Sequence, residues 1–101
     1  MVKYKISVKK DHKTVSVHYD LSVPVGSAEL IASCAVYIDG KDVIEESAAN
    51  NTRFFGTAFA KVNENKDVEV AFNVTSNTDF SADGNDTLRA GHPFDDVDWS
   101  N

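Results

Sequence analysis

Apolar and polar residues alternate along most of the chain between positions 2 and 75. In the first run the apolar positions are Val2, Tyr4, Ile6 and Val8. In the second run they are Val15, Val17, Tyr19, Leu21 and Val23. Because a period of two places these side chains on one face of a strand, the pattern predicts two strands. The polar cluster at 10–13 predicts the turn between them, and Pro24 with Gly26 ends the second strand.

The segment 28–38 fits the spacing of a strand and that of a helix. Its alternate positions are apolar, yet Ala, Glu and Leu are good helix formers. The dipeptide Asp39-Gly40 favours the strand, because it is a preferred two-residue hairpin turn. A partner strand is therefore predicted at 41–46. The register centred on this turn pairs Ile38 with Lys41, Val36 with Val43, and Ala35 with Ile44.

Two more alternating runs, at 54–62 and 68–75, predict another hairpin. With about six to seven strands and short connections, the expected fold is all-β: an antiparallel β-sandwich (immunoglobulin-like) or a small barrel. The alternation is lost after Ser76. We therefore expect an antiparallel β domain at 1–76. The remainder, 77–101, is expected to be an acidic, irregular C-terminal segment, either a tail or a cover strand of the same domain.

The length of 101 residues fits one domain, and 42% apolar residues is an ordinary share for a globular protein. No apolar run approaches the roughly 20 residues that a spanning helix needs, so no membrane segment is predicted. The first residues alternate and contain no hydrophobic region of a secretory signal. A cytoplasmic location is expected unless a signal precedes this sequence. The single cysteine, Cys34, excludes an internal disulfide.

The net charge of −6 is unevenly distributed along the chain. Residues 1–23 carry +3, residues 24–78 carry −4, and residues 79–101 carry −5. An acidic chain of this kind is a poor ligand for double-stranded nucleic acid, whose phosphates dominate affinity. The charge suits a cation or a basic protein surface, although a moderate net charge also serves solubility alone.

One candidate metal site is a segment rich in oxygen ligands near position 80. Its candidate calcium ligands are Asp79, Ser81, Asp83 and Thr87, with Gly84 at the turn position. The glutamate that a calcium loop carries at its twelfth position is replaced by Ala90, and no helices flank the segment. A plain Asp/Gly turn is the simpler interpretation. No other cofactor is indicated.

The C-terminus combines acidic and aromatic residues in one short stretch. The candidate partner-binding residues are Phe94, Asp95, Asp96, Val97, Asp98 and Trp99. Such a segment suits a basic or apolar groove on another protein, where the aromatic rings provide most of the affinity. Two alternatives are that Phe94 and Trp99 cover the domain's own core, or that the segment is disordered.

The sequence gives little support for catalysis. The three histidines have no metal-ligand spacing with Cys34, and no nucleophile accompanies His18 and Asp20 on their strand face. The preferred hypothesis is a non-enzymatic protein-binding module that uses the acidic aromatic C-terminus or a sheet edge. The alternative is a small-ligand or carbohydrate-binding β-sandwich, with calcium assisting. That alternative requires an exposed aromatic platform, for which Phe54, Phe55, Phe59 and Trp99 are the candidates.

Overall fold

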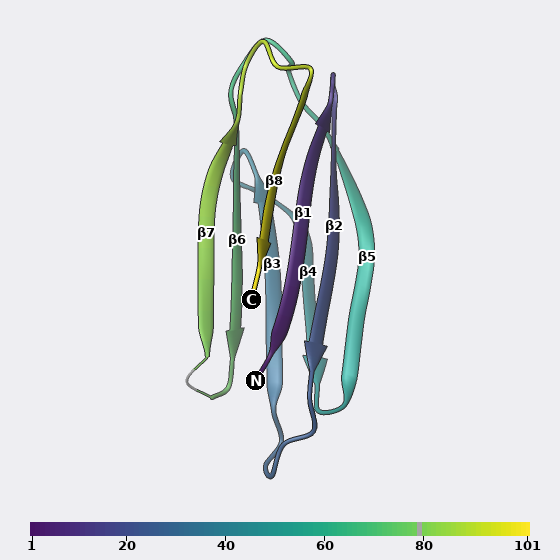
Figure 1. Ribbon diagram of the computed structural model, residues 1–101, viewed down its shortest axis with the longest axis vertical. Coiled ribbons are helices and arrows are strands. Elements are labelled where there is room, and N and C mark those ends of the chain that lie inside the picture. Colours follow the sequence, from purple (N-terminus) through teal and green to yellow (C-terminus); the bar gives the residue numbers. More distant parts are fainter. Residues whose placement is uncertain (79) are drawn as a thin grey trace.

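The computed structural model describes residues 1–78 and 80–101, which form strands and connecting loops (Figure 1). The strands are β1 (Lys3–Asp11), β2 (Thr14–Val23), β3 (Ile31–Ile38), β4 (Lys41–Ala49), β5 (Thr52–Lys61), β6 (Val68–Ser76), β7 (Ser81–Leu88) and β8 (Phe94–Ser100). All pairings between neighbouring strands are antiparallel. No helix that could span a bilayer occurs in these two ranges.

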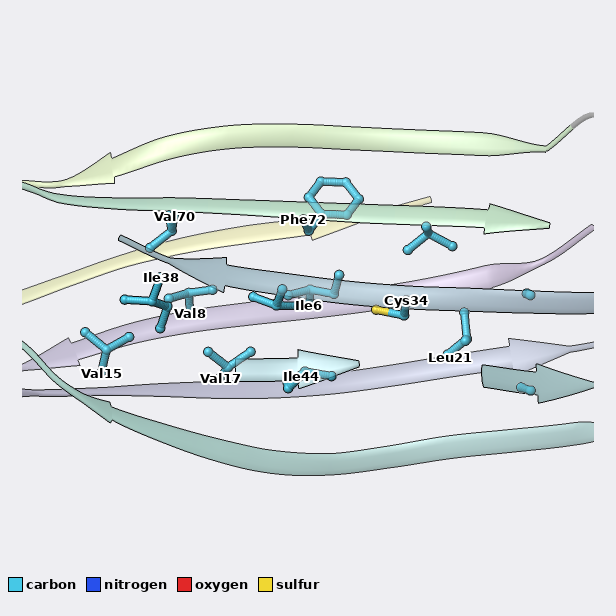
Figure 2. Packing of buried hydrophobic residues seen from close by; sticks show 14 of the residues in the cluster. Ile6, Val8, Val15, Val17, Leu21, Cys34, Ile38, Ile44, Val70 and Phe72 are labelled. Carbon is cyan, nitrogen blue, oxygen red and sulfur yellow. The ribbon is translucent and has the colours of Figure 1, made fainter. Parts of the chain in front are cut away.

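The strands form two four-stranded sheets. The first has the order β5-β2-β1-β8 and the second the order β4-β3-β6-β7. Their inner faces enclose one hydrophobic core, the arrangement of a β-sandwich (Figure 2). The outermost strands are thus β5 and β8 in the first sheet, and β4 and β7 in the second.

The alternation in the sequence predicts the core side of the central strands correctly. The first sheet contributes the buried residues Ile6, Val8, Val15, Val17, Leu21 and Val23. The second contributes Cys34, Val36, Val68, Val70, Phe72 and Val74, among others. Burying one such aliphatic or aromatic side chain stabilises a fold by about 1.5–3 kcal/mol. Tyr4 and Tyr19, also predicted to face the core, pack against it while remaining half-buried.

The strand count and the C-terminal region differ from the prediction. The described residues, 1–78 and 80–101, form eight strands, and most of 77–101 is regular rather than irregular. Strand β7 pairs with β6, and β8 pairs with β1. The sequence signal was weak because the inward positions of β7 include the small Ala82 and Gly84. In β8 only Val97 and Trp99 are apolar on the inward side.

The predicted hairpin between 54–62 and 68–75 is also wrong. Strand β5 pairs with β2, whereas β6 pairs with β3, so the chain crosses from one sheet to the other between them. The turn at Asp39-Gly40 is present, with positive φ at both residues. A bulge between Val36 and Tyr37 shifts the register beyond it, so that Val36 lies opposite Ile44 rather than Val43.

Candidate functional site

The acidic aromatic segment predicted to bind a partner is strand β8. Phe94 is 69% exposed, whereas the Trp99 ring lies 4.8 Å from the Phe72 ring and packs against the core. Asp96 and Asp98 are exposed. Val97 is half-buried and lies on the same face of the strand as Trp99. The structure therefore divides this segment between two faces of a paired strand, and its tryptophan is one of the residues that cover the core.

Asp95 has a structural partner within the chain. The backbone N–H, Nε and Nη2 of Arg89 all donate to its carboxylate, at 2.9, 3.1 and 3.1 Å. The guanidinium and backbone hydrogen bonds of Arg89 hold the pKa of Asp95 well below its usual range. This carboxylate fixes the turn between β7 and β8 and is already engaged by Arg89.

The candidate calcium ligands lie on an extended strand. Ser81, Asp83 and Thr87 belong to β7, and Asp79 lies outside the described residues. With a rise of about 3.3 Å per residue, Ser81 and Thr87 are separated by roughly 20 Å along the strand. No group of three or more His, Cys, Asp or Glu residues suited to a metal occurs in the described ranges.

Cys34 is a buried core residue, 2% exposed. Burial, with the nearby Glu46 carboxylate, raises the pKa of its thiol to about 11. A thiol in this environment is protonated at neutral pH and therefore unreactive.

The four sheet edges differ in how they are protected against pairing with another chain. Acidic residues on the edge strands are Asp42, Glu45 and Glu46 on β4, Asp83 and Asp86 on β7, and Asp95, Asp96 and Asp98 on β8. Strand β4 also contains the register shift of its bulged hairpin. Strand β5 is ten residues long and regularly paired, and it has no acidic residue, proline or bulge. It lacks these usual protections, and its charges, Arg53 and Lys61, lie near its ends.

The backbone of β5 has a free edge whose positions follow from its pairing. The Val62 N–H donates to the Lys13 carbonyl at 2.8 Å, and the register then runs without a shift to Thr52. In an antiparallel ladder, hydrogen-bonded pairs recur at every second residue. The even-numbered residues of β5 therefore bond to β2. The odd-numbered residues direct their N–H and C=O groups to the open side, where Figure 1 shows β5 outermost.

The side chains of these odd-numbered residues lie on the outer face of the first sheet. Phe55 and Phe59 are both 69% exposed. Arg53 forms a bidentate pair with Asp20, at 2.9 and 2.6 Å, and its guanidinium carbon is 5.0 Å from the centre of the Phe55 ring. Hydrogen bonds from Arg53 lower the pKa of Asp20. The Thr57 hydroxyl lies 2.9 Å from Nδ1 of His18.

A shallow cavity of about 290 Å³ adjoins this row of side chains, where β5, β2 and β1 meet. Phe55, Thr57 and Arg53 line it from β5, with His18 and Lys5 among the residues opposite. The site thus combines a free backbone edge, two exposed aromatic rings and a polar hollow.

From the sequence, Phe55 and Phe59 are only candidate aromatic platforms, and the pattern does not identify β5 as an open edge. Their spacing of four residues is the available signal, since it places both rings on one face of a strand. No family model, curated protein or solved structure matches the chain. Function is therefore inferred from the geometry of β5.

Proposed function

We propose that this protein is a non-enzymatic protein-binding module that takes an extended segment of a partner as an additional strand beside β5. The observation that carries the proposal is the open edge of β5, with its unpaired backbone groups and the exposed Phe55 and Phe59 rings. In strand addition, the main-chain hydrogen bonds give affinity and side-chain contacts on alternate residues give specificity.

The energetics favour an aromatic anchor on this strand. Fully burying one phenylalanine contributes about 1.5–3 kcal/mol, and two such residues offset part of the cost of association. Large exposed apolar side chains beside an unpaired edge also carry an aggregation risk. A partner strand that covers the open edge and the exposed rings would remove this risk, which accounts for the presence of both features on β5.

We extend the proposal to the type of sandwich, which we infer to be immunoglobulin-like. In immunoglobulin domains, strands A, B and E are neighbours in one sheet, and C, F and G in the other. The orders β1-β2-β5 and β3-β6-β7 follow the same sequence, with β4 beside β3 and β8 added beside β1. Many binding domains use this architecture, which supports the proposed class of function by analogy.

A second candidate function is binding of a small ligand or carbohydrate in the hollow next to Phe55. The cavity of about 290 Å³, with an aromatic wall and several polar groups, favours it. A substitution of Lys5 distinguishes the two functions, because this residue lines the cavity but lies on β1, two strands away from the open edge of β5. Lys5→Ala should weaken a ligand in the cavity and leave strand addition unchanged.

The test uses a capped peptide with the sequence of residues 52–61. N-methylation of its even-numbered residues blocks hydrogen bonding along one edge and leaves the other able to pair. The peptide therefore cannot grow into a multistranded sheet. Added to the protein, it should slow amide hydrogen exchange at Phe55, Thr57 and Phe59. Thr57→Pro removes an outward N–H and should abolish this protection, while Thr57→Val, which loses only the hydroxyl, should keep it. Unchanged exchange at all three amides in the unsubstituted protein, measured at a dilution where sedimentation shows a monomer, would refute the proposed function.

A further inference from the structure

We propose that the strand added beside β5 is β5 of a second copy of this chain, in an antiparallel pair whose two-fold axis passes through Thr57. This inference rests on the proposed function and names its partner. It follows from the order of residues along β5. It also follows from the β5–β2 pairing, in which the even-numbered residues of β5 bond to β2 and the odd-numbered residues are left open.

The outward side chains of β5 read almost the same in both directions from Thr57. They are Arg53, Phe55, Thr57, Phe59 and Lys61. An antiparallel two-fold pair centred on Thr57 places Phe55 opposite Phe59 of the second copy, and Phe59 opposite Phe55. A self-complementary strand of this kind meets the requirement of an isologous interface, in which the same patch serves both subunits.

The backbone groups match this register. The residues with free N–H and C=O groups are the same odd-numbered residues that the two-fold axis pairs with one another. Five hydrogen-bonded residue pairs then form, with up to about ten backbone hydrogen bonds. The two aromatic pairs lie on the outer face with Cβ atoms about 5.5 Å apart, a distance at which cross-strand rings interact favourably.

On the inner side, the same pairing sets large residues opposite small ones. The register sets Phe54, which is 39% exposed, opposite Ala60 of the second copy. Gly56 lies opposite Ala58 of the second copy. A large residue thus faces a small one at Phe54, and two small residues face each other at Gly56.

Like charges at the two ends of the paired strands repel each other, so the strength of dimerisation should depend on salt concentration. Arg53 comes to lie opposite Lys61 of the second copy, and each chain carries a net charge of −6. Asp20 partly compensates the Arg53 charge through its bidentate contact. Because like charges are screened by salt, dimerisation should strengthen as ionic strength rises, whereas binding of an acidic partner segment would weaken.

The dimer joins the two outer faces into one eight-stranded surface. Its centre holds four phenylalanine rings, Phe55 and Phe59 from each copy. The hollows beside the two Phe55 rings then lie on either side of the junction. Pairing consumes both unprotected edges, and the ends of the enlarged sheet are the two acidic β8 strands.

Cysteine cross-linking tests both the occupant and the register. The two Thr57→Cys residues would face each other with Cα atoms about 5.5 Å apart, within the range of a disulfide. The native Cys34 is buried and does not compete. Thr57→Cys is therefore expected to form a covalent dimer of twice the 11.0 kDa chain mass under mild oxidation. Thr75→Cys, on the outer face of the second sheet, is the matched control and should stay monomeric.

Two further variants establish the antiparallel register. Arg53→Cys and Lys61→Cys should each cross-link poorly alone and form a heterodimer when mixed, since the axis pairs position 53 with position 61. Sedimentation velocity of the unsubstituted protein should give a dimer that Thr57→Pro converts to a monomer. A monomer at all concentrations up to the millimolar range would overturn the inference. A dimer that cross-links equally well at position 75 would also overturn it.

The two proposals fail in distinguishable ways. If the chain is monomeric but the 52–61 peptide still protects Phe55, Thr57 and Phe59, the second-copy inference is wrong and strand addition remains. If the chain is monomeric and the peptide gives no protection, both proposals are wrong.

Discussion

Two proline substitutions one residue apart on β5 are expected to differ sharply in their effect on stability. The N–H of Ala58 points toward β2, where the ladder pairs it with the carbonyl of Val17. The N–H of Thr57 points to the open side. Proline lacks this donor, and within a sheet it is tolerated where the N–H faces solvent.

The size of the difference follows from the hydrogen bond that each variant loses. Ala58→Pro leaves the backbone carbonyl of Val17 without a donor. Because Val17 is fully buried, this unpaired carbonyl costs about 1–3 kcal/mol. Thr57→Pro loses no ladder bond and only the exposed contact with His18, worth about 0.5–1 kcal/mol. The fixed φ of proline strains both positions similarly and cancels in the comparison. The net difference is then about 1 kcal/mol, which corresponds to roughly 5 °C in melting temperature for a domain of this size.

Urea unfolding followed by the fluorescence of Trp99 measures the difference, since this is the sole tryptophan. Thr57→Val is the control, because it loses the His18 contact and keeps the backbone donor. Measurements at two protein concentrations separate the folding energy of one chain from that of a dimer. Equal destabilisation by Thr57→Pro and Ala58→Pro would mean that the Thr57 N–H is bonded within the fold, and the open edge would not exist.

Three other predictions concern the rest of the molecule. Trp99→Ala should destabilise the fold by about 2–4 kcal/mol, because its ring packs against Phe72, whereas Phe94→Ala should cost less than about 0.5 kcal/mol in the same urea assay. Asp95→Asn should lower the melting temperature at pH 7. Because the folded-state pKa of Asp95 is depressed, its stabilisation is present above the unfolded pKa and is lost as pH falls, so the gap to the unsubstituted protein should narrow toward pH 2. Cys34, with a pKa of about 11, should resist iodoacetamide at pH 8 in the folded protein and react readily in 8 M urea; rapid alkylation of the folded protein would contradict its burial.

Local pattern was enough to predict which side of each central strand is buried. The unbroken alternation from Val15 to Val23 specifies a face, because every second side chain must enter the core. It does not specify a neighbour: the order of the strands along the chain favours pairing of β5 with β6, whereas in the structure β5 pairs with β2. For 77–101 the sequence left a tail and a cover strand as alternatives, and the positions of β7 and β8 could not be predicted because their inward positions hold small or isolated apolar residues. Pairing with β6 and β1 compensates for that weak signal.

The candidate site was harder to predict, since it depends on contacts between residues far apart in the chain. The sequence places Phe55 and Phe59 on one face of a strand, but their exposure results from β5 being outermost in its sheet. The C-terminal aromatics illustrate the opposite case. Phe94 and Trp99 are five residues apart, so a strand directs them to opposite faces, and only pairing with β1 determines which one meets the core.

The most direct test of the open edge is residue-resolved amide hydrogen exchange along β5, first in dilute protein and then with the 52–61 peptide or at high protein concentration. In dilute protein, Phe55, Thr57 and Phe59 should exchange quickly while Phe54, Gly56 and Ala58 exchange slowly. The first three amides should then become protected when a strand is added. Uniformly slow exchange in dilute protein, or an alternation that neither peptide nor concentration changes, would contradict the account.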